Sequence, residues 1–201
     1  MTPAQHSKNY VPSRIQKFSG FNGLKDGRHI FAMGTFPRQH DATPSRMVID
    51  TNVNGSFLMA RAITPHLIRV GWGRIINVSV SHSTMRRRGL SLWSAEGSPP
   101  PLESETLIWA HDLRGTGVTV NALLPGGATL TGMIPDTFPA NARGTLLDPE
   151  IMVPPLLWLV SEETNAITSC RVTANRWEDG NPLATTENAG WGSDPMVASV
   201  S

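Results

Sequence analysis

Residues 71–79, which read GWGRIINVS, decide how this 201-residue chain folds. Gly71 and Gly73 bracket a tryptophan and are expected to end a helix, because glycine is the usual residue just beyond a helix C-terminus. The residues that follow, 74–80, are mostly apolar and β-branched, as in a strand that is buried on both faces of a parallel sheet. This stretch therefore predicts a helix, a glycine turn and a buried strand in succession.

The same order of elements is expected on both sides of this stretch. Apolar residues recur at three- and four-residue steps over 45–70, which predicts an amphipathic helix leading into the strand. A second helix is expected over 102–114, after three consecutive prolines, because proline is tolerated only in the first turn of a helix. Gly115 and Gly117 end that helix before a second apolar strand at 118–124. Helices that alternate with apolar strands predict an α/β fold with right-handed crossovers between parallel strands.

The remaining residues carry weaker patterns. Further elements are expected at 29–33 (a strand), 149–160 (a helix) and 169–176 (a strand). Apart from that first strand, residues 1–44 are rich in Gly, Pro, Ser, Asn and charged residues and are expected to be irregular. Residues 178–201 contain few apolar anchors and are predicted to form a disordered tail. The sequence thus predicts one α/β domain over residues 45–177.

The composition excludes several classes of protein. Lys and Arg total 17 against 16 for Asp and Glu, so the chain has no electrostatic footprint for nucleic acid or an anionic membrane. The longest apolar run, 151–160, contains two prolines and is shorter than the roughly 20 residues that span a bilayer. No signal peptide is recognisable, so a cytoplasmic protein is expected. Cys170 is the only cysteine, which excludes an internal disulfide and a cysteine metal cluster, and no metal site is expected.

Four short strings together resemble a known family. Residues 48–57, 71–79, 115–121 and 125–126 are similar, in order and spacing, to central and C-terminal segments of short-chain dehydrogenases/reductases. The resemblance implies a partial Rossmann-like parallel sheet with flanking helices, in which the N-terminal nucleotide-binding half is largely missing. It also implies NAD or NADP as the cofactor.

The family's glycine-rich turn, Thr-Gly-x-x-x-Gly-x-Gly, holds the cofactor pyrophosphate with backbone amides at a helix N-terminus. In this chain Gly20, Gly23 and Gly27 have a different spacing, and no apolar strand precedes them. A surface turn is the better interpretation of these glycines. Cofactor binding by this chain is therefore expected to be weak or absent.

The resemblance also assigns the catalytic positions. In the family, a tyrosine is the general acid/base, and a lysine four residues later binds the cofactor ribose and lowers the tyrosine pKa. The tyrosine position falls on Trp93 and the lysine position on Gly97. An indole N–H only donates, and glycine carries no charge, so neither residue can replace the original. Because no tyrosine or lysine occurs after Lys25, we expect an NAD(P)-dependent oxidoreductase by lineage whose catalysis is impaired.

The remaining site residues follow from the same resemblance. Asn52 matches an asparagine that supports a water-mediated proton path, although an asparagine beside a helix often only caps it. The substrate-orienting serine falls on Val80, between Ser79 and Ser81, and a one-residue bulge would let Ser81 serve. The residues that match the family's nicotinamide loop are Pro125, Gly126 and Thr131. A Pro-Gly pair after a strand is also an ordinary turn, so the structural alternative stays open for this loop.

Two other functions compete with an oxidoreductase. Family members commonly pair through the helices that match 45–70 and 102–114, so the chain could be a non-catalytic protein that forms homo-oligomers through these helices. Their apolar faces also fit simple core burial. The third possibility is the product of a decayed gene.

The residues at 93–99, WSAEGSP, suggest how the catalytic pair was lost. The codons TAT GGT CC, which begin a Tyr-Gly-Pro sequence, give Trp and Ser when they are read two bases out of frame. We therefore predict that the coding DNA contains a Tyr-x-x-x-Lys motif in an alternate frame at codons 93–97. Inspection of that DNA tests the hypothesis, and an alternate frame without the motif would rule it out.

Overall fold

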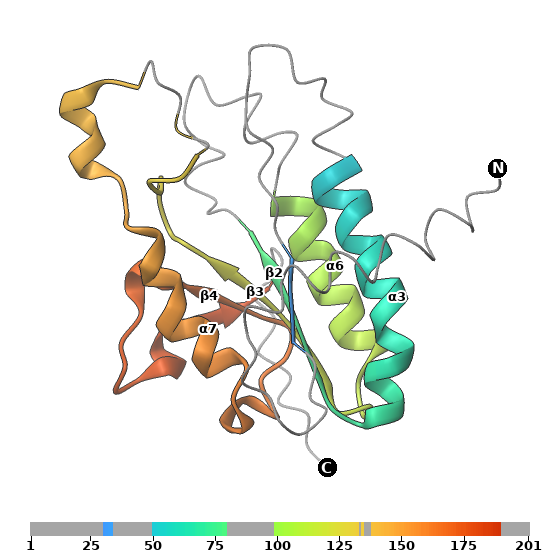
Figure 1. The fold of residues 1–201 in the computed structure, drawn as a ribbon. Helices are drawn as coiled ribbons and strands as arrows, with labels where there is room; N and C mark the ends of the chain where they lie inside the picture. Colours follow the sequence, from blue (N-terminus) through green and yellow to red (C-terminus); the bar gives the residue numbers. More distant parts are fainter. Residues whose placement is uncertain (1–29, 34–49, 80–98, 133, 135–137, 190–201) are drawn as a thin grey trace.

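The computed structural model describes residues 30–33, 50–79, 99–132, 134 and 138–189. Its strands form one five-stranded sheet in the order β1-β2-β3-β4-β5, in which β1 to β4 are parallel and β5 is antiparallel to β4 (Figure 1). The strands are β1 (Ile30–Met33), β2 (Gly73–Val78), β3 (Val118–Leu124), β4 (Cys170–Thr173) and β5 (Thr186–Asn188). The expected α/β fold with a mostly parallel sheet is confirmed.

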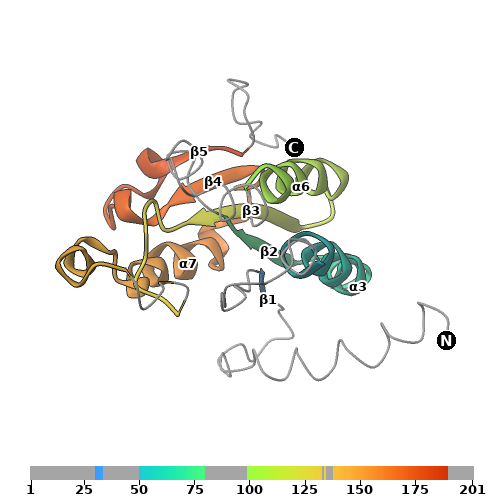
Figure 2. The same cartoon turned by 90° about the horizontal axis from the view of Figure 1, so that it is seen from above.

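Helices cover both faces of the sheet, as Figure 2 shows. On one face lie α3 (Gly55–Val70), which follows a π-helix η1 (Asp50–Asn54), and α6 (Pro99–Asp112). On the other face lies α7 (Val153–Leu159). Short 3-10 helices complete the described chain: η2 (Ala140–Thr145), η3 (Pro149–Met152), η4 (Glu162–Thr164), η5 (Ala174–Arg176) and η6 (Pro182–Thr185). Among the described helices, none combines the length and hydrophobicity that a bilayer crossing requires.

The predicted elements are present, but most of their boundaries differ from the prediction. The helix expected over 45–70 is a π-helix over Asp50–Asn54 followed by α3, and residues 45–49 lie outside the described residues. The strand expected at 118–124 is confirmed residue for residue. The helix expected from residue 102 begins at Pro99, because the prolines occupy its first turn, where a backbone N–H has no helical partner in any case. The helix expected at 149–160 is divided into η3 and α7, and the strand expected at 169–176 ends at Thr173, where η5 begins.

The prediction of a disordered tail is wrong for residues 178–189. Thr186–Asn188 forms β5, and the N–H of Ala189 donates to the carbonyl of Ser169 over 2.8 Å. The sequence pattern missed this strand because its stability comes from pairing with β4, a contact that local composition does not reveal. Residues 190–201 lie outside the described residues.

The strands of the sheet bury apolar side chains on both faces. Ile75 of β2 and Val120 of β3 pack with Leu67 of α3, and each of these side chains is fully buried. On the opposite face, Ile76 and Leu123 join a second cluster. Its other buried members are Leu159 and Val172. Burial on both faces explains why β2 and β3 read as almost continuous apolar runs.

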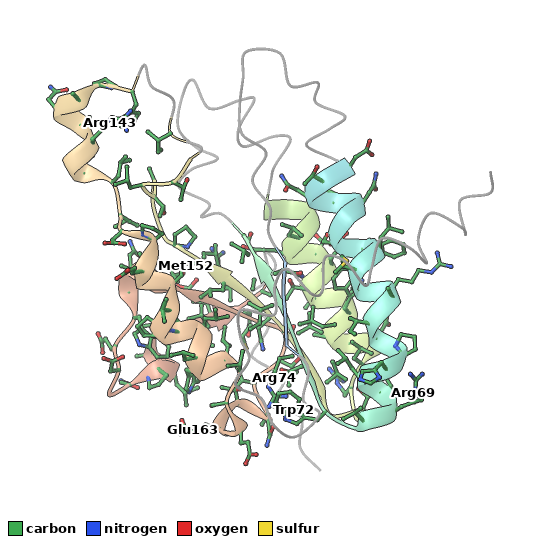
Figure 3. The ribbon with its side chains drawn as sticks, in the orientation of Figure 1. Arg69, Trp72, Arg74, Arg143, Met152 and Glu163 are labelled. Atoms are coloured by element: carbon green, nitrogen blue, oxygen red, sulfur yellow. The ribbon has the colours of Figure 1, made fainter. Side chains whose placement is uncertain are left out.

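A polar cluster fastens β2 to the segment after α7. Arg74, which is almost fully buried, stacks on the Trp72 ring with its guanidinium carbon 4.4 Å from the ring centroid (Figure 3). The same guanidinium donates to the carbonyl of Ser161 over 3.1 Å and to the side-chain oxygen of Asn165. Because it lies at the amino-terminal end of β2, away from the strand ends where ligands bind in such sheets, we interpret this cluster as structural.

Two glycine turns at the amino-terminal end of the sheet touch each other. Gly71 has a φ of 71° and caps α3 through its N–H, which donates to the carbonyls of Leu67 (3.0 Å) and Ile68 (3.1 Å). Gly117 has a φ of 79°, and a Cβ atom there would overlap the carbonyl oxygen of Gly71. Gly73 donates to the Gly117 carbonyl over 3.3 Å, so the two turns hold β2 beside β3.

We predict that Gly117→Ala and Gly115→Ala differ sharply in the free energy of unfolding. Both glycines have a φ of 79°, but nothing lies within 4 Å of a Cβ on Gly115. Gly115→Ala should therefore cost only the left-handed strain of about 1–2 kcal/mol. Gly117→Ala adds a backbone overlap and should cost more than about 4 kcal/mol. Urea unfolding of both variants measures the difference, and equal losses would contradict the proposed contact between the turns.

Candidate functional site

The candidate site lies at the carboxyl ends of the parallel strands, where ligands bind in open α/β sheets. Ser79 follows β2 and Pro125 follows β3 at this edge. The amino-terminal ends of α3 and α6 lie at the same end of the sheet (Figure 1). Asn52, in the π-helix before α3, therefore belongs to this edge as well. Ser81, Trp93 and Gly97 lie outside the described residues.

Asn52 is half-buried, and its backbone is held by a neighbour on α3. The hydroxyl of Ser56 lies 2.9 Å from the Asn52 carbonyl oxygen. Asn54, two residues later, donates from its side chain to Asp50 over 2.7 Å. The structure thus gives Asn52 a fixed backbone position at the start of α3. A π-helix is rare and often occurs at functional sites, which makes this position noteworthy.

Ser79 is the serine that the structure places at the end of β2. Its N–H donates to the carbonyl of Leu123 over 3.0 Å, and its side chain is buried. Among the described residues, the Ser79 hydroxyl oxygen has no hydrogen-bonding partner. Asn77, two residues earlier and so on the same face of β2, donates to the Thr106 hydroxyl of α6 over 2.8 Å. An unsatisfied buried hydroxyl is costly, so this position is suited to a small polar group or a water molecule.

The Pro125–Gly126 turn is held by a residue that the sequence prediction missed. Asn175 donates from its backbone to the Pro125 carbonyl over 3.1 Å and from its side chain to the Gly126 carbonyl over 3.3 Å. A Cβ on Gly126, whose φ is 88°, would overlap the side-chain oxygen of Asn175. The close contact with Asn175 thus explains why a glycine occupies position 126. Only the pairing of Leu124 with Thr173 in the sheet brings Asn175 to this turn, so no local sequence signal could have identified it.

The described residues do not fit the phosphates of a dinucleotide. A pyrophosphate needs backbone N–H groups at a helix start that follows a strand. Within the described ranges, Gly71 and Gly117 lead into strands, and Gly126 leads into a loop. The start of α6 is occupied by Pro99–Pro101, and proline has no N–H to donate. The edge of the sheet thus offers hydrogen-bonding groups but no phosphate-binding turn in the part of the chain that is described.

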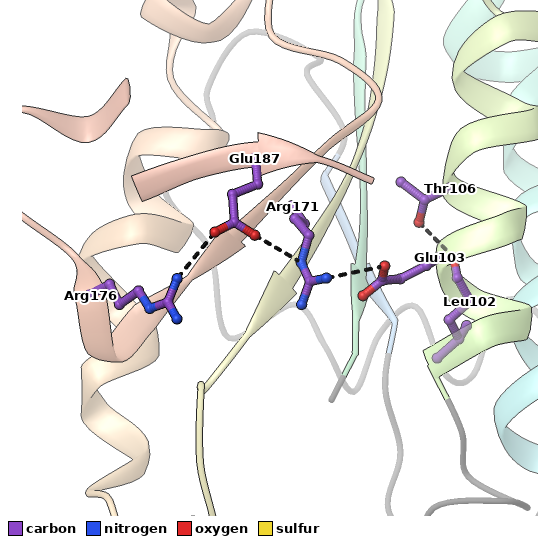
Figure 4. Close-up of polar contacts among 6 residues, drawn as sticks. All are labelled: Leu102, Glu103, Thr106, Arg171, Arg176 and Glu187. Atoms are coloured by element: carbon purple, nitrogen blue, oxygen red, sulfur yellow. Dashed lines mark hydrogen bonds and ion pairs between the residues drawn. The ribbon is translucent and has the colours of Figure 1, made fainter. Parts of the chain in front are cut away.

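Four charged side chains of α6 and the C-terminal segment form a chain of ion pairs. Glu103 of α6 and Arg171 of β4 are both buried, and Oε2 of Glu103 lies 3.6 Å from Nη1 of Arg171 (Figure 4). Nε of Arg171 also lies 3.8 Å from Oε2 of Glu187 on β5. The other carboxylate oxygen of Glu187 lies 3.1 Å from Nη1 of the exposed Arg176. A buried pair is costly to break because one charge is left without compensation, whereas an exposed pair contributes little. These residues connect α6 with the C-terminal strands and are best explained as structural.

No described residue offers an obvious nucleophile or metal site. Burial raises the pKa of the Cys170 thiol to about 11, so the thiolate that acts as a nucleophile is scarce at neutral pH. Among the described residues, no group of His, Cys, Asp and Glu side chains is arranged to hold a metal ion. The described residues also include no tyrosine and no lysine.

Comparisons with known proteins agree with this architecture. A family model described as short chain dehydrogenase matches residues 1–142. Glucose 1-dehydrogenase 2 of Bacillus subtilis (strain 168) is 29% identical over 160 residues, which cover 75% of this chain and 57% of that protein. The 3-oxoacyl-acyl-carrier-protein reductase FabG of Thermotoga maritima is 28% identical over 177 residues, which cover 84% of this chain and 70% of that protein.

The fold has solved counterparts as well. The crystal structure of a 3-oxoacyl-acyl-carrier-protein reductase with bound NAD from Brucella melitensis superposes with a TM-score of 0.57 at 23% sequence identity. The match covers 80% of this chain and 63% of that structure. At this identity the similarity concerns the fold. The matched region also amounts to little more than half of the glucose dehydrogenase, at 57% of its length.

Proposed function

Because this chain belongs to the short-chain dehydrogenase family, we propose that it is an oxidoreductase by descent whose catalysis of hydride transfer is impaired. The observation that carries this proposal is the absence of tyrosine and lysine after Lys25. The absence is a property of the sequence, so no arrangement of residues 80–98 can supply a phenol and an ammonium group at the catalytic positions.

The chemistry explains why this absence matters. Reduction of a carbonyl by hydride leaves an alkoxide that needs a proton, and a positioned acid accelerates that step. Trp93 and Gly97 provide neither an acid nor a cation. His66 and His111 lie near the carboxyl-terminal ends of α3 and α6, at the opposite end of these helices from Asn52. Asn52 and Ser79, and Ser81 by its position in the sequence, can orient a polar group but are poor acids.

The family implies NAD or NADP as the cofactor, which supplies the hydride when it is bound. Pro125, Gly126 and Thr131 are the residues that would contact its nicotinamide amide. Two observations argue against binding. Gly126 is in contact with Asn175, and the described residues contain no phosphate-binding turn. We therefore propose that this chain binds either cofactor weakly or not at all.

We predict that NADH and NADPH show no saturable binding to the purified chain. The expected result follows from the lack of a phosphate-binding turn in the described residues and from the missing lysine. Titration of each cofactor, monitored by its fluorescence, is the measurement, with the urea-unfolded chain as the reference for non-specific signal. Saturable binding to the folded chain alone would contradict the cofactor part of the proposal.

A second candidate function is self-association through α3 and α6. Phe57 and Leu58 of α3 are 45% and 53% exposed, and Ile108 of α6 is 56% exposed. A shallow groove of about 130 Å³ runs between the two helices, and its lining includes Phe57, Ala60, Trp109 and Leu113. Arg61 and Asp112 also line it and carry opposite charges. This combination supports a two-fold contact with a second copy, because in such a contact Arg61 of one copy can face Asp112 of the other.

We predict that the chain is a dimer and that Phe57→Ser and Ile108→Ser shift it towards a monomer. Phe57 lines the groove and Ile108 lies beside Trp109 on α6, so each change removes exposed apolar area from this helix pair and leaves the buried core intact. Leu183→Ser is the matched control, because Leu183 is equally exposed (56%) and lies on η6, outside the groove. Light scattering over a range of concentrations measures the mass. A monomeric parent chain, or an equal effect of all three changes, would refute association through α3 and α6.

A further inference from the structure

Ser56, near the start of α3, lies within hydrogen-bonding distance of three acceptors. Its hydroxyl oxygen is 2.7 Å from the carbonyl of Val53, 2.9 Å from the carbonyl of Asn52 and 2.9 Å from the carboxyl oxygen Oε2 of Glu105 on α6. A hydroxyl has only one proton to donate. The cluster therefore needs a second proton if all of these short contacts are to be favourable.

The backbone contacts of Ser56 hold the junction between two kinds of helix. The chain changes from π-helix to α-helix at Gly55, directly before Ser56. Serine hydroxyls inside helices commonly bond to carbonyls three and four residues earlier, as Ser56 does here. The Ser56 side chain is buried, so water does not replace these bonds. The position of the Asn52 carbonyl thus depends on where the Ser56 proton points.

A neutral Glu105 would supply the missing proton. Its carboxyl O–H then donates to the Ser56 oxygen, and the Ser56 hydroxyl donates to the backbone carbonyls. An ionised Glu105 only accepts, so it would draw the Ser56 proton away and leave the Ser56 and Val53 oxygens 2.7 Å apart without a proton between them. Burial also raises the pKa of the Glu105 carboxyl, and the Ser56 hydrogen bond opposes this effect only in part. Geometry and burial thus both shift Glu105 towards its neutral form.

Among the described residues, neighbouring charges do not reverse this preference. The charged and titratable residues on the elements packed against α6 are Asp50, Arg61, His66, Arg69, Arg74 and Arg171; those on α6 itself are Glu103, His111 and Asp112. In the part of the chain that the structure describes, Glu105 takes part in no ion pair. Asp50 accepts from Asn54, and Arg171 faces Glu103 and Glu187.

We propose that Ser56 and Glu105 form a proton-controlled clasp between α3 and α6, which neutral Glu105 closes and ionised Glu105 opens. When closed, the clasp fixes the π-helical turn that carries Asn52. The folded-state pKa of Glu105 is raised, so the contribution of the clasp to stability is complete below the unfolded-state pKa. That contribution is lost as the pH rises through the folded-state pKa. This inference does not depend on whether the chain binds a cofactor or forms a dimer.

The first test compares thermal unfolding of the parent chain with that of Glu105→Gln, from the ordinary glutamate pKa of about 4.3 up to neutral pH. Ionisation of Glu105 should lower the unfolding midpoint of the parent chain as the pH rises. Glutamine keeps a donor at this position at every pH, so the midpoint of the variant should fall less over the same range. Glu163→Gln, at an exposed position on η4, is the matched control and should follow the parent curve. If the unfolding midpoints of the parent and of Glu105→Gln changed equally with pH, the proposal would be overturned.

The second test separates the clasp from burial alone and does not depend on comparing stabilities. The carboxyl carbon of Glu105, followed by NMR, should titrate above the exposed glutamates, and the carbonyl carbon of Asn52 should titrate with the same midpoint. Ser56→Ala should abolish the response at Asn52 while the Glu105 titration remains visible. An ordinary glutamate midpoint for Glu105, or an Asn52 response that persists in Ser56→Ala, would contradict the clasp.

Discussion

The contact between the turns at Gly71 and Gly117 is the constraint on which the rest of the structure depends. It brings the ends of α3 and α6 together and fixes Gly73 opposite Val118 in the sheet. From that register follow the pairs along β2 and β3, up to Val78 opposite Leu123. A shift by one residue would turn every side chain of β2 to the opposite face of the sheet.

The same register arranges the candidate site. It places Ser79 beside Leu123 and directs Asn77 towards Thr106 of α6. It also sets α3 and α6 side by side, so that Ser56 meets Glu105 across the helix pair. The carboxyl edge of the sheet is thus built from contacts that begin at its opposite end. Loss of the glycine turns should therefore disturb the site without touching any of its residues.

The sequence shows the parts of this fold that have a local cause. The glycines before β2 and β3 and the apolar run of β3 predict those strands closely, because turn geometry and burial are encoded in neighbouring residues. The sequence pattern predicts a start of α6 that is three residues too late, because the three prolines also fit a first helical turn. Two features were missed, β5 and the contact of Asn175 with Gly126, because both depend on sheet pairing with β4. Pairing between distant segments leaves little trace in local pattern.

Fold and chemistry make separate demands on this chain. The fold needs glycine turns and apolar strands, which the chain keeps. The family's reaction uses a phenol and an ammonium group, which the chain lacks after Lys25. Within the described residues, the buried charges of Glu103 and Arg171 pair with each other. Under the proposed function, this chain keeps the family fold without the residues that carry the family's reaction.

Transfer of deuterium from the cofactor to a carbonyl compound tests this separation most directly. The purified chain would be incubated with NADH or NADPH that carries deuterium at the hydride position, together with a panel of aldehydes and ketones, and the alcohols would be analysed by mass spectrometry. The account predicts no incorporation above that of a reaction without protein. Incorporation that rises with protein concentration and saturates with substrate would contradict it.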